Sequence, residues 1–258
     1  MNKYRLPIYC IGDSHANFFS GLDSIQSSWP EKSIDLIPFF KSFRLGPVLA
    51  YNLCKANTKS KGREKLFAIL KRIPKESTIL LCFGEIDCRA HLLKQAEIQN
   101  IKIKTIIKEC VDRYIPVIDE IKNLNYNVVV WNVIPSSPTG FPDKPAYPTY
   151  GTCRERNDVS RLFNQFLEEQ LTNKNIQFIS IFEKLIDENG LTLARFLMDE
   201  LHLSQAAMPL AIKKINNKLQ LNLPSTKNEI LQFNLPLPKH KTHMIENLLD
   251  YFRNKMFR

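Results

Sequence analysis

Two short polar segments near opposite ends of the chain carry residue types that can perform nucleophilic chemistry. The first, Asp13-Ser14-His15, directly follows the apolar run 6–12. A serine just after a buried strand lies at the carboxyl edge of an open sheet, where such sheets bind ligands. A sharp turn at that edge can present the Ser14 hydroxyl to a substrate. The alternative is a helix N-cap, because Ser and Asp are both common caps.

The second segment is Asp199-Glu200-Leu201-His202, which precedes a predicted helix. A carboxylate three residues before a histidine can fix the tautomer of the ring and stabilise its protonated form. In an α/β sheet this loop also emerges at the carboxyl edge, so His202 can meet Ser14 and remove its proton. By itself, His202 fits a surface or capping role equally well. The pairing with Ser14 is what favours a triad of Ser14, His202 and Asp199.

The elements that must position these residues alternate between strands and helices. Short apolar runs predict strands, and apolar residues at helical spacing predict helices. The predicted strands cover residues 6–12, 33–39, 78–83, 127–133 and 176–181, and the predicted helices cover residues 16–27, 47–55, 64–72, 101–123, 154–171, 183–188 and 204–219. Pro116 predicts a kink or a break in its helix. The alternation predicts an α/β fold, a three-layer α/β/α sandwich with a mostly parallel sheet.

Two other regions have a distinct composition. A loop at about residues 135–151 contains five prolines and two tyrosines, and loops of this length are often binding loops. After about residue 221 the chain becomes rich in proline and then forms an amphipathic pattern over residues 244–257. We therefore expect a main domain of residues 1–221 and a C-terminal extension of residues 222–258. We expect the short helix of the extension to pack on the domain or on a partner.

The charge and composition limit the classes of partner. The chain has 258 residues, a formal net charge of +10 and 44% hydrophobic residues, which is enough for a sizeable core. The positive charge suits an anionic partner, such as an acidic glycan, a nucleotide, nucleic acid or a lipid surface, or simply a lysine-rich solvated surface. Nucleic acid is not expected, because the lysines are spread along the chain without a basic and aromatic cluster.

The cysteines and the N-terminus bear on the compartment. None of the six cysteines belongs to a C-x-x-C pair, and Cys10 and Cys82 lie in apolar runs, so we expect a reduced, cytoplasmic protein. The first residues lack the apolar region of a signal peptide, and no stretch approaches the roughly 18 apolar residues of a membrane span. His240 and His243 lack a nearby carboxylate or cysteine, so neither a metal nor a cofactor is expected. The sequence does not predict an oligomeric state.

The polar segments occur in the order found in a known family. Gly12-Asp13-Ser14-His15 resembles the first block of the SGNH (GDSL-like) hydrolase superfamily, and Asp199-x-x-His202 is similar to its last block. Gly46 fits the second-block glycine, and Gly84-Glu85-Ile86-Asp87 aligns with the third block. The four blocks together span roughly residues 5–220 of the chain.

This resemblance implies a flavodoxin-like sheet and a set of catalytic roles. It implies that Ser14 is the nucleophile, that His202 is the base and that Asp199 orients His202. It also implies an oxyanion hole formed by the backbone amides of Ser14 and Gly46 and by an asparagine side chain from the third block. Ile86 stands at that asparagine position and cannot donate from its side chain. The loss of one such donor typically costs about a hundredfold to a thousandfold in rate.

Several nearby residues are candidates to replace the missing donor or to contact a substrate. The candidate replacements are Arg89, His91 and Asn52. Arg89 could instead clamp a carboxylate or a phosphate, or form an ion pair with Glu85 or Asp87. His15 stands where leucine is common in the family and either lines the site or packs. We predict substrate contacts for Arg89, Glu85 and His15, and a structural, turn-capping role for Asp87.

Three hypotheses of function follow. The first is a serine esterase that cleaves a small acyl ester through an acyl-enzyme on Ser14, or an O-acyltransferase in which a sugar hydroxyl replaces water. The basic charge and the aromatic, proline-rich loop favour an O-acetylated carbohydrate, such as an anionic surface glycan. The second is a catalytically weak binding module on the same fold, with Ile86 as the mark of lost chemistry. The third is a nucleotide-binding or nucleic-acid-binding protein, which rests on charge alone and lacks a Gly-x-Gly-x-x-Gly or P-loop motif.

Overall fold

Five parallel strands form the centre of the molecule. The computed structural model describes residues 2–139, 148–225, 229–230 and 233. The strands are β1 (Ile8–Gly12), β2 (Phe40–Arg44), β3 (Thr78–Cys82), β4 (Asn127–Trp131) and β5 (Gln177–Ile179). They pair in the order β2-β1-β3-β4-β5, and every neighbouring pair is parallel. This is the flavodoxin-like order, so the predicted sheet is confirmed.

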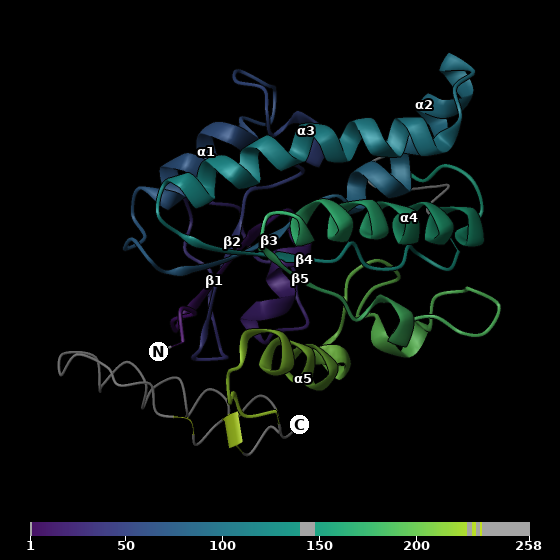
Figure 1. Cartoon of the computed structure of the whole chain (residues 1–258). Helices are drawn as coiled ribbons and strands as arrows, with labels where there is room; N and C mark the ends of the chain where they lie inside the picture. Colours follow the sequence, from purple (N-terminus) through teal and green to yellow (C-terminus); the bar gives the residue numbers. More distant parts are fainter. Residues whose placement is uncertain (1, 140–147, 226–228, 231–232, 234–258) are drawn as a thin grey trace.

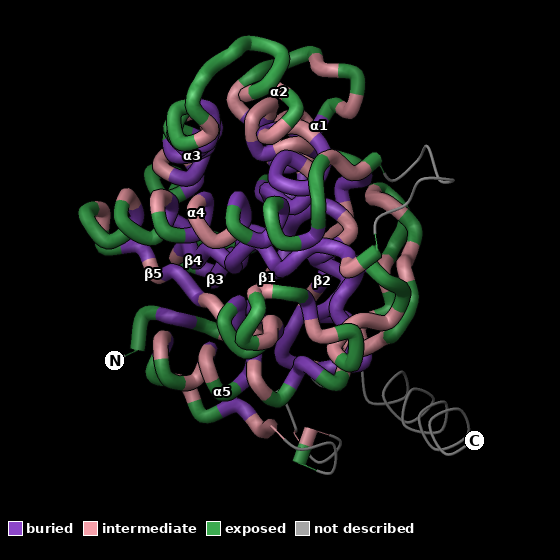
Figure 2. Tube along the Cα trace, turned by 90° about the vertical axis from the view of Figure 1, so that its right-hand side faces the viewer, coloured by how far each residue is buried: buried purple, intermediate pink, exposed green. Residues whose placement is uncertain are grey.

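Helices cover both faces of the sheet and complete the three predicted layers (Figure 1). One face carries α1 (Gly62–Leu70), α3 (Ile103–Asn123) and α4 (Cys153–Thr172), with α2 (Leu92–Gln99) beside them. The other face carries α5 (Met208–Leu219) and the short 3₁₀ helix η1 (Ser14–Ser20). Figure 2 shows the buried strands between these layers.

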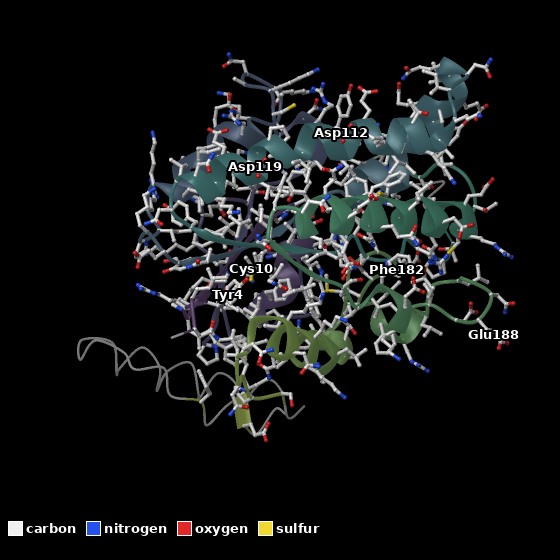
Figure 3. The ribbon with its side chains drawn as sticks, viewed as in Figure 1. Tyr4, Cys10, Asp112, Asp119, Phe182 and Glu188 are labelled. Atoms are coloured by element: carbon white, nitrogen blue, oxygen red, sulfur yellow. The ribbon has the colours of Figure 1, made fainter. Side chains whose placement is uncertain are left out.

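Successive side chains of β1 point to opposite faces of the sheet, and the core forms one cluster on each face. Ile11 belongs to the cluster under α1, α3 and α4, whereas Ile8 and Cys10 belong to the cluster that includes α5 and η1. Figure 3 labels Cys10 and Tyr4 on the α5 side of the sheet and Asp112 and Asp119 along α3 on the opposite side. Because both faces are covered, the strands are nearly continuous apolar runs, which is why the sequence reveals them.

Tight backbone pairing at Gly12 brings three loops to one edge of the sheet. Gly12 lies level with Arg44 of β2 and Cys82 of β3. A Cβ on Gly12 would lie 2.1 Å from the carbonyl oxygen of Cys82, so only glycine permits this approach. The pairing continues one step further, because Leu45 N donates to Gly12 O at 2.8 Å and Asp13 N donates to Cys82 O at 3.2 Å. The segments after β1, β2 and β3 therefore leave the sheet side by side.

The N-terminal third differs most from the predicted elements. The helix predicted for residues 16–27 is η1, which ends at Gly21 in a left-handed conformation with φ +86°. The strand predicted for residues 33–39 is wrong, because β2 begins at Phe40. Residues 33–39 form a loop instead, in which Asp35 Oδ1 accepts hydrogen bonds from Ser42 N and Ser42 Oγ. The backbone amides of Leu36 and Ile37 donate to Ser20 O and not to a strand, so these buried apolar residues pack without joining the sheet.

The remaining differences are smaller. The helix predicted for residues 47–55 is reduced to a 3₁₀ turn, Ala50–Asn52, and that for residues 183–188 to Phe182–Lys184. The sequence did not predict α2 or the π-helical turn Asp87–His91 that precedes it. α3 is unbroken through Pro116. Pro116 is on the exposed face of α3, where water can satisfy the carbonyl group that its missing N–H leaves free.

The C-terminal extension is described only in part. Leu223 belongs to the core beside α5, and Phe233 packs edge-on against Phe39 with ring centroids 5.3 Å apart. The helix predicted for residues 244–257 lies outside the described residues, as do Pro142, Pro145 and Tyr147 of the proline-rich loop. The domain boundary near residue 221 stays a prediction. Within the described ranges, none of the helices has the length and apolar character needed to cross a membrane. All six cysteines are free thiols.

Asp87 ties the segment after β3 to the segment after β2. Its carboxylate is buried and accepts hydrogen bonds from Ala50 N at 2.8 Å and Tyr51 N at 3.2 Å. Asp87 therefore caps a turn, as predicted. The capped turn is Ala50–Asn52, which follows β2, and not the turn after β3. This bridge fixes the backbone that follows Gly46.

Replacing Asp87 is expected to destabilise the fold. Asp87→Ala leaves the Ala50 and Tyr51 amides without their acceptor and should lower the free energy of unfolding by about 1–3 kcal/mol in urea denaturation. Asp87→Asn keeps one acceptor oxygen and should lose less. An Asp87→Ala protein that unfolds at the wild-type urea concentration would contradict this role.

Candidate active site

The turn after β1 leaves the Ser14 hydroxyl available. Asp13, and not Ser14, is the N-cap of η1, because Asp13 Oδ1 accepts the His15 N–H at 2.9 Å. The alternative in which Ser14 caps the helix is therefore wrong. Ser14 is half-buried, at the first position of η1 and just beyond the carboxyl end of β1, which lies beside the central strand β3.

Ser14, His202 and Asp199 form one hydrogen-bonded line. Ser14 Oγ lies 2.8 Å from His202 Nε2. His202 Nδ1 lies 2.7 Å from Asp199 Oδ2 and 3.0 Å from Asp199 Oδ1. The predicted contact between Ser14 and His202, which are 188 positions apart in the sequence, is thus confirmed. The arrangement permits His202 Nδ1 to donate to the carboxylate while Nε2 accepts the serine proton.

A tight turn holds the carboxylate and the imidazole in register. The backbone amides of Leu201 and His202 donate to Asp199 Oδ1 at 3.1 Å and 2.7 Å. Met198 N donates to His202 O at 2.9 Å and closes the turn. Glu200 sits at its tip with φ +46°, a left-handed conformation that is uncommon for residues other than glycine. The helix that begins after Ser204 then anchors the turn, because Ser204 Oγ caps Ala206 N.

The electrostatics favour a neutral imidazole and an ionised carboxylate. Burial lowers the pKa of His202, and the charge of His15 lowers it further against the opposing effect of Asp199. Burial by itself would raise the pKa of Asp199, but the hydrogen bond and charge of His202 and two backbone amides outweigh it and lower that pKa to about 2. His202 is therefore free to accept a proton near neutral pH.

The predicted oxyanion glycine lies at the same edge of the sheet as Ser14. Gly46 follows Leu45, whose amide donates to Gly12 O. Gly46 has φ +95°, a conformation that a side chain would strain, although the space beside it is open. This placement is compatible with a backbone amide directed at the Ser14 site. A role for the amides of Ser14 and Gly46 in binding an oxyanion remains a prediction.

Among the described residues, no hydrogen bond links Ser14 to any of the three candidate replacements for the missing donor. Arg89 donates Nε to Glu85 Oε1 at 2.7 Å and Nη1 to Pro148 O. The structure thus places Arg89 in the ion pair that was its alternative role. His91 has a pKa lowered by burial and by the charge of Arg89, and Asn52 ends the turn that Asp87 caps.

The three predicted substrate contacts form one buried cluster. Glu85 bridges Arg89 and His15, and the His15 ring packs against the ring of His202 with centroids 4.8 Å apart. All three side chains are less than a tenth exposed. Contact between any of them and a substrate remains a prediction.

A small crevice beside the triad contains a residue that sequence reasoning missed. The crevice has room for about one water molecule. Half of its lining is polar and half is apolar: Ser14, His15, Asn17, Ser24 and His202 on the one hand, and Phe18, Leu22, Ile25, Met198 and Leu203 on the other. Asn17 is buried, and its amide atoms have no hydrogen-bond partner among the described residues. The signal in the sequence is its spacing, because side chains three residues apart share one face of a 3₁₀ helix.

Two buried arginines hold the ends of the proline-rich loop. Arg156 Nε donates to Ser136 Oγ at 2.9 Å, and Arg156 Nη2 donates to Ser137 O at 2.8 Å. At the other end, Arg89 binds Pro148 O, and Arg89 O accepts the Tyr150 amide at 3.0 Å. The loop therefore starts and ends beside the third block. In the described part of the chain, no cluster of His, Cys, Asp and Glu side chains could hold a metal ion.

Comparisons with known proteins agree on the fold. No protein-family model and no curated protein matches the sequence. Among solved structures, the chain is similar to a protein from Streptococcus pneumoniae described as a platelet activating factor, with 17% identity, a TM-score of 0.50, and coverage of 83% of this chain and 84% of that one.

Two further structures are similar over the same extent. One is described as an acylhydrolase from Bacteroides fragilis, with 12% identity, a TM-score of 0.50, and coverage of 84% of this chain and 86% of that one. The other is a catalytic mutant of an acetylxylan esterase from Geobacillus stearothermophilus, with 13% identity, a TM-score of 0.50, and coverage of 84% and 95%. The chain therefore shares its three-layer α/β/α fold with these three structures.

Proposed function

We propose that the protein is a serine hydrolase of the SGNH type that cleaves a small acyl ester through an acyl-enzyme on Ser14. The observation that carries the proposal is the line from Ser14 Oγ through His202 to Asp199, with distances of 2.8 Å and 2.7 Å. A likeness of fold does not by itself fix an activity. The acylhydrolase and the acetylxylan esterase among the similar structures support the choice of ester chemistry.

The reaction follows from the positions of the three side chains. Ser14 Oγ attacks the ester carbonyl carbon while His202 Nε2 takes the hydroxyl proton, and Asp199 stabilises the resulting imidazolium. The tetrahedral intermediate collapses when His202 returns this proton to the leaving alcohol, and the acyl group remains on Ser14. His202 then deprotonates a water molecule, or an acceptor hydroxyl, which attacks the acyl-enzyme and releases Ser14.

Two backbone amides are the donors we assign to the oxyanion. They are the amides of Ser14 and Gly46, which the pairing of β1 with β2 places at one edge. Ile86 supplies no side-chain donor, so we expect weaker stabilisation of the intermediate than in a site with three donors. Ile86 is also the observation that favours the second candidate, a binding module with little catalysis.

The crevice beside Ser14 supports a small acyl group. Its apolar lining suits a methyl or ethyl group, and its limited volume disfavours long chains. The Asn17 amide offers one donor and one acceptor to a polar atom that enters the crevice. We propose an O-acetyl group on a carbohydrate as the substrate class, because the net charge of +10 suits an anionic glycan and because the proline-rich loop begins and ends beside the third block. Transfer to a sugar hydroxyl is the related alternative.

Ser14→Ala tests the nucleophile. A fluorophosphonate probe should label the wild-type protein, and p-nitrophenyl acetate should be hydrolysed. Ser14→Ala should abolish labelling and lower turnover by about 10⁴-fold or more, because no other group can form the acyl-enzyme. Ser60→Ala removes a hydroxyl that lies 3.4 Å from Thr58 Oγ1 and is not part of the triad; it is the matched control and should be labelled normally. A folded wild-type protein with neither labelling nor turnover between pH 5 and 10 would favour the binding module.

Asp199→Asn tests the orienting carboxylate. The amide is nearly isosteric but cannot hold the tautomer of His202 with Nδ1 protonated, so kcat should fall by about 10⁴-fold with little change in stability. The adjacent Glu200→Gln is the matched control, and it should retain wild-type kcat. If Asp199→Asn turned over at the wild-type rate, Asp199 would have no part in orienting His202.

The length of the acyl chain tests the crevice. The specificity constant should fall from p-nitrophenyl acetate to butyrate and octanoate, because each added methylene lacks space beside Ser14. Ile25→Ala enlarges the crevice and should raise the butyrate-to-acetate ratio by about tenfold, which corresponds to the discrimination that one or two methylenes provide in an apolar pocket. An unchanged ratio in Ile25→Ala would place the acyl group elsewhere.

A further inference from the structure

His15 occupies an unusual position for a charged side chain. It follows the proposed nucleophile directly, and its ring packs on the ring of His202 with centroids 4.8 Å apart and planes inclined by 34°. The contact covers one face of the imidazole whose edge is hydrogen-bonded to Ser14 and Asp199. His15 therefore restricts the movement of His202 out of the triad, in addition to the hydrogen bonds within it.

Glu85 and Arg89 hold His15 from the next strand. His15 Nε2 lies 3.2 Å from Glu85 Oε2, at ion-pair distance but without hydrogen-bond geometry, and the other oxygen of Glu85 accepts a hydrogen bond from Arg89 Nε at 2.7 Å. The exposed fractions of the three side chains are 7%, 4% and 3%. A carboxylate this deeply buried needs compensation by positive charge, and the two neighbours provide it from opposite sides.

The charges that face His15 favour its protonated form. Asp13 from the β1 turn and Glu85 from the segment after β3 favour the cation, whereas Arg89 opposes it. The His202 ring, from the turn before α5, packs against His15. With His15 protonated, two cations and two carboxylates balance one another, whereas a neutral His15 would leave an excess negative charge in the interior. Although burial opposes the cation, Asp13 and Glu85 outweigh it and raise the pKa of His15.

The pKa of Glu85 is shifted in the opposite direction to that of His15. Burial by itself would raise its pKa, but the charge of Arg89 and the contact with His15 lower it to about 2. The carboxylate thus remains ionised throughout the range in which His202 titrates. His15 keeps its counter-ion over that whole range.

We propose that His15 is a positioning residue for His202: an imidazolium held by the Glu85–Arg89 ion pair packs against the proposed catalytic base, fixes its ring and opposes its protonation. This inference rests on the proposed function, because His202 has to be the base. The groups that face His202 are Asp199, which favours its cation, His15, which disfavours it, and Glu85, which favours it more weakly. Removal of the His15 charge should therefore make His202 easier to protonate.

The test is the pH dependence of His15→Gln. The rate of fluorophosphonate labelling should fall on the acid side as His202 becomes protonated, and the midpoint should move to higher pH by about one unit in His15→Gln. At a pH below both midpoints, this shift makes the labelling rate, relative to the same protein's rate at pH 8–9, about tenfold smaller in His15→Gln than in the wild type. Lys213→Gln removes one positive charge from the exposed side of α5 and should leave the midpoint unchanged.

A direct titration of His202 separates the proposal about His15 from the proposed function. The imidazole carbon-bound proton of His202, followed by NMR in the Ser14→Ala background with and without His15→Gln, should show the same upward shift without any turnover. A parallel loss of rate at every pH, or an unchanged His202 titration in a folded His15→Gln protein, would reduce His15 to a packing role and overturn the inference. If the wild-type protein shows neither labelling nor turnover while the His202 shift is present, the proposed function fails and the interaction between the rings stands.

Discussion

The close backbone approach of β1 to β3 at Gly12 is the constraint on which the site depends. A side chain at Gly12 would collide with the Cys82 carbonyl. Glycine at this position therefore allows β1 and β3 to stay in tight parallel contact up to the turn. The loops after β1, β2 and β3 must then leave the same edge together. Ser14, Gly46 and the third block come together for this reason, although they are far apart in the sequence. His202 completes the site from a turn that is closed by its own backbone hydrogen bonds.

The same edge buries the carboxylates of Asp13, Glu85 and Asp87, and each has at least one polar or charged neighbour. An isolated ion in a protein interior costs several kcal/mol, so such groups persist only with partners. Asp87 accepts two backbone amides, and Glu85 lies between a guanidinium and an imidazole. Asp13 has one oxygen bonded to the His15 amide, and burial raises its pKa to about 6. These contacts join the loops after β1, β2 and β3. A contact that pairs a charge in one loop therefore also holds the neighbouring loop in place.

The sequence predicts the sheet and the triad better than the segments between them. β1, β3, β4 and β5 are buried on both faces, so their apolar runs are unambiguous, and Asp199 and His202 are close enough in sequence for their spacing to be informative. β2 was misplaced because residues 33–39 are also apolar, and the side chain of Asp35, which caps Ser42, decides the outcome. The turns around Ser14 and Ala50 are 3₁₀ helices fixed by tertiary contacts, which helical periodicity does not reveal.

The partners of His15 could not be derived from spacing, because they depend on packing between separate loops. Glu85 and Arg89 are four residues apart, so an ion pair between them can be foreseen. Nothing in the sequence shows that Glu85 also reaches His15, or that the His15 ring lies on His202. The resemblance, in which His15 replaces a leucine, leaves open whether His15 lines the site or packs. The structure adds a charge to that packing contact.

The charge of His15 acts on two developing charges with opposite signs. In the proposed acyl transfer the oxyanion becomes negative while His202 becomes positive, so a nearby cation stabilises the first and destabilises the second. The His15 ring is in contact with His202, so the charge of His15 acts directly on the developing imidazolium. On this proposal, the charge keeps the base unprotonated at lower pH, at the expense of a less stable imidazolium in the transition state.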